Sequence, residues 1–348
     1  MSIPLKNDFE MIAAYTQRLN AVYGKIVLVL LVAQIAVAAK AQTTVTWKDL
    51  DSAAASNMQA VTYKTVNDSA IKFYYSLPPK ASLAHKFPTI VFIHGGAWRG
   101  GNAKSFFAYA AYFAMRGMVG ISIDYRLLKR PTDDINNCIA DCKSAIRYIK
   151  QHASQLCVDT NRLVICGESA GGHLAACMQL LDGYNDPNED STLSTKPTAL
   201  VLLNPVVNVT TATFLKFVDA SILFAPKSIT DSVVLHNQCF EKAKAISPLF
   251  VIKSALPPTL LINGMNDKIT PPAYAEAFAQ KANQYKSNCQ LVLLPNTGHA
   301  FAVPRYKATE AETLQTVATI SDFLTSFKYL KHKVQLINSN DPNWITKK

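Results

Sequence analysis

Residues 166–173 read Cys166-Gly167-Glu168-Ser169-Ala170-Gly171-Gly172-His173, between an apolar run at 162–165 and a small-residue run at 174–181. The two runs predict a strand that leads into Ser169 and a helix that leaves it. Gly-x-Ser-x-Gly in this setting is typical of a nucleophile elbow, a strained turn whose neighbours at minus two and plus two must lack a Cβ atom. Because the pattern arises by chance in roughly one chain in ten of this length, the rest of the chain must supply a base, an acid and oxyanion donors.

The segments around this turn alternate between apolar strands and amphipathic helices. Two β-rich runs, 60–66 and 70–75, are separated by Asn67-Asp68-Ser69, which predicts an antiparallel hairpin. The later strands are solidly apolar, as in parallel sheets that are covered on both faces. We therefore predict an α/β fold with a mostly parallel sheet, an N-terminal antiparallel hairpin and helices on both faces. The later strands are expected at 88–93, 119–123, 162–166, 199–203, 259–263 and 290–294, and the helices at 103–116, 134–152, 170–181, 272–285 and 309–330.

The domain organisation is simple, because the chain has no internal repeat and no second domain boundary. One α/β domain is expected over 58–330, after a polar and loosely held approach at 42–57 and before a basic tail at 331–348. Residues 182–197 are rich in Asp, Asn, Ser and Pro and predict a solvent loop. Residues 204–249 exceed any simple crossover and predict an insertion over the strand ends, where such sheets hold their active sites.

The N-terminal 41 residues have the layout of a secretory signal peptide. An apolar run follows Lys25 and ends in Ala39-x-Ala41, and it is too short to span a bilayer comfortably. If translation began at Met11, the segment before the apolar run would be basic, because it would no longer include Asp8 and Glu10. A signal anchor is the competing interpretation. We therefore expect a secreted or periplasmic protein without a stable membrane span.

The formal net charge of +11 does not by itself indicate a nucleic-acid-binding protein. Lysines and arginines are scattered in ones and twos, and the compact basic groups are confined to 328–333 and 347–348. A nucleic-acid footprint requires basic residues gathered on one face. No nucleic-acid partner is therefore expected.

The seven cysteines have irregular spacing, which does not indicate a disulfide framework in a domain of this size. Cys166 and Cys177 flank the elbow and are expected in the core. Cys138 and Cys142 are one helical turn apart without further ligands, which makes a poor zinc site. The sequence leaves open whether two of the other cysteines form a disulfide. We expect neither a metal ion nor a cofactor.

Oxyanion donors are expected from the loop after the strand at 88–93, which reads His94-Gly95-Gly96. Two glycines at a strand end let the backbone approach a reacting group, and their N–H groups can point into the site. We predict that Gly95 and Gly96 act together with the N–H of Ala170. The His94 ring is expected to hold the loop by hydrogen bonds.

The base is expected in a loop near the C-terminal end, and His299 follows a strand in that region. His173 lies on the elbow helix and points away from Ser169 by helical geometry, so a structural role is expected. The other histidines are poorly placed: His85, His152, His236 and His332.

The acid is expected between Ser169 and His299 in the chain, at the end of a strand. Asp267 follows the strand at 259–263, and one helix and one strand separate it from His299, which brings the two loops side by side. The alternatives are Asp182 in the solvent loop and Asp219 and Asp231 in the insertion.

With these residues identified, the chain resembles the α/β-hydrolase fold esterases that are similar to hormone-sensitive lipase and to bacterial acetyl and feruloyl esterases. The resemblance runs from about residue 60 to 330. It rests on six motifs: His94-Gly95-Gly96-Ala97-Trp98, Asp124-Tyr125-Arg126-Leu127, 167–175 around Ser169, Ser247-Pro248-Leu249, Asn263-Gly264-Met265-Asn266-Asp267 and Gly298-His299-Ala300-Phe301.

The resemblance implies that Asp124 and Arg126 support the site and that Trp98 lines the acyl pocket. The chain departs from the lipase-like members, because Leu128-Lys129-Arg130 replaces their Ala-Pro-Glu and a short hairpin replaces their helical cap. Ala97 stands where they have a third glycine. The chain is therefore more similar to the carbohydrate-esterase members.

These expectations combine into a serine carboxylic ester hydrolase that uses Ser169, Asp267 and His299 and passes through an acyl-enzyme. The expected substrates are short acyl esters of small molecules or polysaccharides, with acetyl and feruloyl groups as candidates. The alternatives are a serine peptidase or amide hydrolase on the same fold, and a non-catalytic binding protein.

Overall fold

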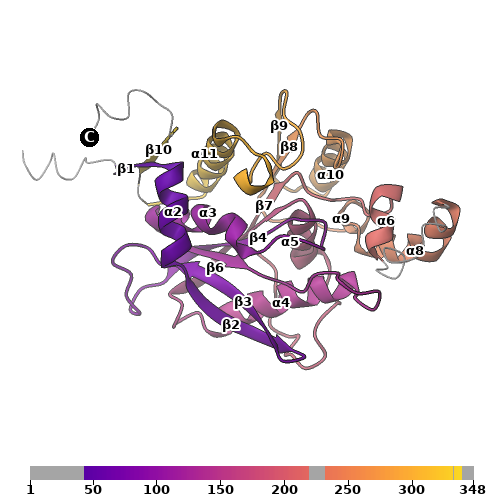
Figure 1. Ribbon diagram of the computed structural model, residues 1–348, viewed down its shortest axis with the longest axis horizontal. Helices are drawn as coiled ribbons and strands as arrows, with labels where there is room; N and C mark the ends of the chain where they lie inside the picture. The colour runs from indigo at the N-terminus through magenta and orange to yellow at the C-terminus, as the bar shows by residue number, and fades with distance from the viewer. Residues whose placement is uncertain (1–42, 219–231, 332, 339–348) are drawn as a thin grey trace, which may run out of the picture. The chain divides into compact units, whose positions relative to one another are not determined.

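The structure is a computed structural model that describes residues 43–218, 232–331 and 333–338 (Figure 1). The predicted signal peptide and the end of the predicted tail lie outside these ranges. Within them, no helix is both long and apolar enough to cross a lipid bilayer.

Eight strands form one sheet in the order β2-β3-β5-β4-β6-β7-β8-β9. β2 and β3 form the predicted antiparallel hairpin, in which Asn67 and Asp68 have the positive φ angles, 47° and 61°, that a two-residue turn requires. β3 is also antiparallel to β5, and all later neighbours are parallel. The predicted sheet is therefore confirmed. The strands are β2 (Gln59–Val66), β3 (Ser69–Ser76), β4 (Phe87–Ile93), β5 (Val119–Ile123), β6 (Val158–Glu168), β7 (Ala199–Leu203), β8 (Thr259–Gly264) and β9 (Cys289–Leu294).

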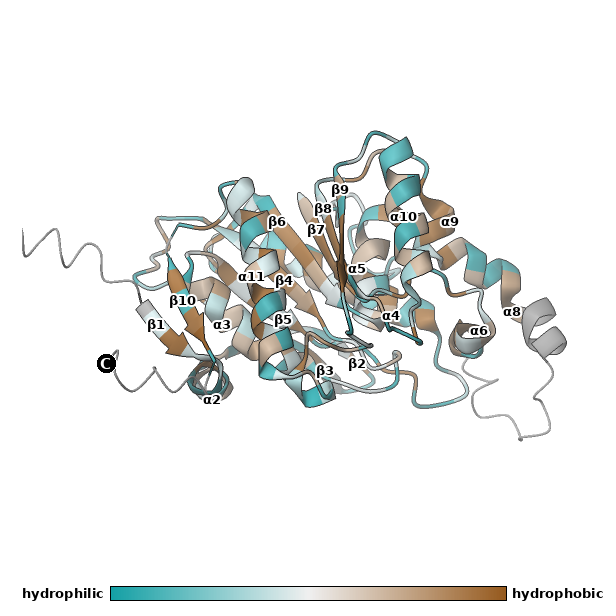
Figure 2. Cartoon of the chain, turned by 90° about the horizontal axis from the view of Figure 1, so that it is seen from above, coloured by the Kyte–Doolittle hydropathy of each residue, from teal (hydrophilic) through white to brown (hydrophobic). Residues whose placement is uncertain are grey.

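Helices cover both faces of this sheet, as predicted. Successive residues of a strand point to opposite faces, so Phe92 of β4 lies in one buried cluster and Ile93 in the other. Figure 2 shows the central strands mostly in the brown of hydrophobic residues and teal on the outer sides of α10 and α11. One face packs against α3 (Phe107–Met115) and α11 (Glu310–Ser326), and the other against α4 (Ile135–Gln151), α5 (Ala170–Leu180) and α10 (Pro272–Gln284).

Residues 43–57 of the predicted approach form a strand and a helix, where the sequence predicted a loosely held segment. Residues Trp47–Asn57 form helix α2, whose first turn is capped by Thr46, since its side chain accepts a hydrogen bond from the N–H of Asp49 at 3.0 Å. Trp47 and Leu50 are buried on one side of α2, and the Trp47 ring lies edge-on to Tyr109 of α3. This spacing of three residues gives a helical apolar face that the Ala/Ser-rich composition concealed.

The predicted tail is also structured in part, because Val334–Ile337 form strand β10, which pairs with β1 (Thr43–Thr46). The segment predicted as an insertion contains α6 (Ala212–Val218), α8 (Ser232–Ile246) and the start of α9 (Pro248–Val251). Asp219 and Asp231 lie outside the described residues. Two short 3-10 helices, η1 (Ala103–Phe106) and η2 (Pro304–Tyr306), complete the described elements.

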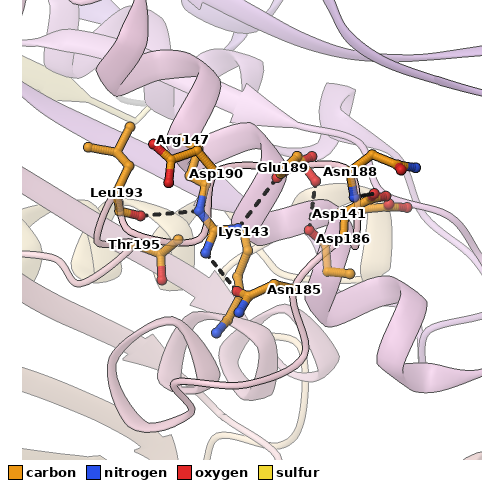
Figure 3. A network of polar contacts seen from close by, with 12 residues as sticks. Asp141, Lys143, Arg147, Asn185, Asp186, Asn188, Glu189, Asp190, Leu193 and Thr195 are labelled. Carbon is orange, nitrogen blue, oxygen red and sulfur yellow. Dashed lines mark hydrogen bonds and ion pairs between the residues drawn. The ribbon is translucent and has the colours of Figure 1, made fainter.

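The loop between α5 and β7 has no helix or strand, as predicted, but buried cations of α4 hold it in place. Arg147 donates hydrogen bonds to Leu193 O at 3.1 Å and Asn185 Oδ1 at 2.6 Å and forms an ion pair with Glu189 (Figure 3). Lys143 donates to backbone carbonyls at the end of α5, and burial lowers its pKa to about 8. The polar composition of the loop thus reflects internal pairing as well as contact with solvent.

Asp141 joins this loop to the hairpin and to the segment after β5. Its carboxylate is fully buried and pairs with Lys64 of β2 at 3.0 Å and with Arg126 Nε at 2.7 Å. Lys64 also pairs with Asp186 of the loop at 2.6 Å. Asp141 therefore holds cations from two other parts of the fold.

We predict that Asp141→Asn lowers the free energy of unfolding by about 3 kcal/mol or more, because Lys64 and Arg126 would lose a buried partner. Asp159→Asn is the matched control, since it breaks an ion pair at the surface, that between Asp159 and Arg162. The control should cost less than about 1 kcal/mol. Denaturant unfolding of both variants measures this difference, and equal losses would contradict the role of Asp141.

All seven cysteines are buried. Cys166 of β6 and Cys177 of α5 lie in the core, as predicted. No disulfide forms among the described residues.

Candidate active site

Ser169 occupies the predicted elbow between β6 and α5, with φ of 54° in the left-handed region. A Cβ atom on Gly167 would collide with the carbonyl of Gly171, and one on Gly171 would collide with the carbonyl of Ile93 at the end of β4. The two glycines are therefore required by close backbone approach, as the motif predicted.

Ser169, Asp267 and His299 come together at the carboxyl edge of the sheet, after β6, β8 and β9. Asp267 Oδ2 lies 2.7 Å from His299 Nδ1, and His299 Nε2 lies 2.9 Å from Ser169 Oγ. Because a carboxylate can only accept, the Nδ1–H donates to Asp267, and Nε2 is left to accept the serine proton. The carboxylate is fully buried, whereas the imidazole is one-fifth exposed. This is the order and geometry of a serine hydrolase triad.

A short turn holds the Asp267 carboxylate from its other side. Its Oδ1 accepts hydrogen bonds from the N–H groups of Ile269 and Thr270 at 2.8 Å each, and its Oδ2 accepts one from Thr270 Oγ1 at 2.7 Å. Burial favours a raised pKa for Asp267, but the hydrogen bonds from His299 and Thr270 outweigh burial and lower it. Asp267 is therefore ionised. Sequence analysis missed Thr270, although its place three residues after an aspartate is typical of a side-chain-stabilised turn.

The oxyanion loop follows β4 and differs from the prediction by one residue. Gly96 and Ala97 line the cavity beside Ser169, and both have positive φ angles, 108° and 52°. Among the described residues, none accepts a hydrogen bond from the N–H of Gly96, Ala97 or Ala170. Gly95 instead lies against the Glu168 carboxylate, where a Cβ would collide with it. The donors that the structure offers are thus those of Gly96, Ala97 and Ala170, which corrects the assignment of Gly95.

The predicted supports are His94 of the oxyanion loop and the two residues that the resemblance implied, Asp124 and Arg126. His94 is buried, its ring stacks on Tyr125 at 4.4 Å, and its Nδ1 lies 2.8 Å from Gly95 O. Asp124 accepts a hydrogen bond from the N–H of Ala103 at 2.7 Å. Arg126 forms the bidentate pair with Asp141. None of these three side chains lines the cavity around Ser169.

The cavity beside Ser169 has a volume of about 230 Å³. Trp98 does not line it, which corrects that prediction. The left-handed conformation of Trp98, with φ of 55°, turns its indole into the core, where it lies 6.1 Å from the Phe214 ring and nearly perpendicular to it. Phe214 of α6 both contacts the Trp98 ring and lines the cavity. The lining residues are Gly96, Ala97, Glu168, Ser169, Val206, Phe214, Ile269, His299, Ala300 and Tyr306.

His173 lies outside the triad, as predicted. It is fully buried on α5, and its Nε2 lies 2.9 Å from Ile246 O. Burial lowers the pKa of His173 to about 4, and that of His94 likewise to about 4. Both rings are therefore neutral near pH 7. The side chains of His236 and His332 lie outside the described part of the chain.

Asn204 and Glu168, to which sequence analysis assigned no role, lie near His299. Asn204 follows β7 with φ of 34°, and its Nδ2 lies 2.9 Å from Glu168 Oε1. The same Nδ2 lies 3.3 Å from His299 Nε2 and 3.4 Å from Nδ1. No sequence motif marked this arrangement, because it depends on the pairing of β6 with β7.

Within the described residues, no group of three or more His, Cys, Asp or Glu side chains is placed to hold a metal ion.

The fold and the triad together define an α/β-hydrolase. The BD-FAE family model matches residues 76–282, more than half of the chain. The chain therefore belongs to the BD-FAE family, which is a hormone-sensitive-lipase-like family of α/β-hydrolases.

The similar proteins found by comparison are esterases. The chain is 29% identical over 226 residues to esterase LipC of Mycobacterium tuberculosis, a match that covers 62% of this chain and 53% of LipC. It thus spans about half the length of this curated relative. Among solved structures, Thermogutta terrifontis esterase 2 with propionate bound is 31% identical, with a TM-score of 0.69 over 80% of this chain and 97% of that one. The same esterase phosphorylated by paraoxon gives 30% identity and a TM-score of 0.68, with the same coverage.

We predict that the free energy of unfolding decreases as the pH falls from about 6.5 to 4, since the unfolded chain binds protons on His94 and His173 that the folded chain excludes. His173→Gln retains a donor for Ile246 O but cannot titrate. It should reduce the slope by up to about 1.4 kcal/mol per pH unit. Denaturant unfolding at several pH values measures the slope. His85→Gln, at an exposed histidine, is the control and should leave it unchanged, and an unchanged slope in His173→Gln would contradict the prediction.

Proposed function

We propose that this protein is a serine carboxylic ester hydrolase for short acyl esters. The observation that carries the proposal is the Ser169–His299–Asp267 chain of hydrogen bonds, which opens on a cavity beside unpaired backbone N–H groups. A nucleophile, its base and oxyanion donors thus surround one space where a carbonyl carbon can react. The membership of the BD-FAE family and the similarity to esterases support this proposal.

The proposed reaction passes through an acyl-enzyme. Ser169 Oγ bonds to the acyl carbon as its proton moves to His299 Nε2, and the N–H groups of Gly96, Ala97 and Ala170 stabilise the oxyanion. The carbon–oxygen bond to the alcohol then breaks, and His299 returns the proton to the departing oxygen. Water repeats the sequence on the acyl-enzyme and releases the acid and free Ser169. Asp267 holds the imidazole in the tautomer that both steps need.

The size and lining of the cavity favour short acyl groups. Its volume, about 230 Å³, is below the roughly 300–1,000 Å³ of cavities that take drug-sized ligands. Val206, Phe214 and Ile269 give it an apolar wall. The structure of the related esterase with propionate bound supports the same size class. Acetyl groups are therefore better candidates than feruloyl groups.

The proposed alcohol part of the ester is a polysaccharide or a small molecule outside the cytoplasm. The support is the signal-peptide layout of residues 1–41, which would direct the protein to the periplasm or the medium.

Activity on a panel of p-nitrophenyl esters tests the proposal. We expect hydrolysis of the acetate and butyrate esters, weak hydrolysis of the octanoate, and acetate release from acetylated xylan. Ser169→Ala should lower kcat by about 10³-fold or more. Paraoxon should add one diethyl phosphoryl group to the native protein and none to Ser169→Ala, as measured by mass spectrometry. An inactive native protein without the adduct would refute the proposal, and rapid hydrolysis of the octanoate would refute the short-acyl assignment.

Phe214→Ala should open the cavity toward Trp98 and raise kcat/KM for the hexanoate ester relative to the acetate by about 10-fold, since each accommodated methylene contributes about 1 kcal/mol or more. Phe217→Ala is the matched control, because Phe217 also contacts Trp98 but does not line the cavity. The ratio of the two kcat/KM values measures the change. An equal change in both variants would show a general loosening of α6 instead.

A further inference from the structure

The triad accounts for one carboxylate beside His299, but the site contains a second. Glu168 immediately precedes the nucleophile, is 1% exposed and lines the cavity. Its backbone continues β6, so the side chain is fixed by the same elbow that orients Ser169. A buried carboxylate is costly to ionise unless a hydrogen bond or an opposite charge stabilises the ionised form.

Asn204 connects this carboxylate to the imidazole. Its side-chain N–H₂ donates to Glu168 Oε1 at 2.9 Å and lies at nearly equal distances, 3.3 and 3.4 Å, from the two ring nitrogens of His299. Since Nδ2 cannot bond to both nitrogens at once, this geometry indicates that the amide packs against the ring. The carboxylate oxygen is therefore within about 6 Å of the imidazole.

The Asn204 backbone is fixed by the neighbouring strand and turn. Its backbone N–H donates to Ile262 O of β8 at 2.8 Å, and its backbone carbonyl oxygen lies 3.3 Å from Thr270 Oγ1. Its φ of 34° is in the left-handed region. From this backbone the side-chain amide reaches both Glu168 and His299.

We propose that Glu168 and Asn204 are positioning residues for His299, with Asn204 holding the ring and the Glu168 carboxylate stabilising the imidazolium that forms when Ser169 is deprotonated. Glu168 does not take the proton, because Asn204 separates it from the ring. The site then has two buried carboxylates around one imidazole. Asp267 is hydrogen-bonded to Nδ1, and the charge of Glu168 acts on the ring from the other side of the Asn204 amide. This inference rests on the proposed hydrolase function.

Several groups set the charge state of Glu168. Burial and the charge of Asp267 raise the pKa of Glu168 above its ordinary value, and the hydrogen bond from Asn204, the attraction of His299 and the nearby N–H of Gly95 limit this rise. Asn204 and a protonated His299 thus favour the ionised form. The titratable groups that face Glu168 are His299, Asp267, Tyr306, Tyr109, Tyr125 and Cys166.

The test is the pH profile of kcat/KM on p-nitrophenyl acetate for Glu168→Gln and Asn204→Ala. Glu168→Gln should lower kcat about 10-fold and move the acid limb to lower pH by about one unit, the size expected for unit charges at this distance. Asn204→Ala should also move the limb to lower pH, because Glu168 loses the hydrogen bond that keeps it ionised and stabilises the imidazolium less. A general loss of packing would lower kcat without moving the limb in either variant.

Two controls complete the design. Glu168→Asp retains the charge and should restore the native acid limb, and Glu276→Gln makes the same chemical change at an exposed position of α10 and should alter nothing. If the native enzyme hydrolyses the ester but the acid limb stays fixed in both Glu168→Gln and Asn204→Ala, the inference is overturned and the proposed function stands. If Glu168→Gln does not fold, the shift in Asn204→Ala decides. An inactive native enzyme would overturn the function itself.

Discussion

The site depends on the close approach of the elbow to the end of β4. Ser169 can adopt its left-handed turn only because Gly167 and Gly171 leave no Cβ atoms between β6, α5 and the Ile93 carbonyl. The N–H of Ser169 bonds to Leu203 O of β7, and its carbonyl accepts from the N–H of Val206. Three neighbouring strands thus fix one strained residue. The same approach sets the oxyanion loop beside the serine, since that loop begins where β4 ends.

Burial favours the neutral form of each ionisable group around this turn, but the hydrogen-bond partners of these groups differ. It keeps His94 and His173 neutral, so that neither competes with His299 as a cation or a base near pH 7. It would also neutralise Asp267, but this carboxylate receives hydrogen bonds from Thr270, Ile269 and His299. The charge state of each group therefore follows from its hydrogen-bond partners, because desolvation is common to all of them.

Sequence analysis predicted the sheet and the triad because both are carried by local patterns. Apolar strands, the Gly-x-Ser-x-Gly turn and the chain order of Ser169, Asp267 and His299 require no knowledge of tertiary contacts. The errors have a different origin. Gly95 was predicted as a donor and Ala97 was not, because the direction of an N–H group depends on φ, and a sequence does not show that an alanine adopts a left-handed turn. Helix α2 was missed because its apolar face comprises few residues in an Ala/Ser-rich segment.

The contacts of Asn204 and Trp98 depend on tertiary structure, so local sequence patterns could not predict them. Asn204 reaches His299 only because β7 lies between β6 and β8. Trp98 enters the core only because three successive loop residues, Gly96, Ala97 and Trp98, have positive φ angles. A buried indole now secures one end of the oxyanion loop, with its edge against the phenylalanine that closes the cavity. Core packing and substrate selection consequently share one side chain. A lineage that altered its acyl preference at this wall would have to repack its core at the same time.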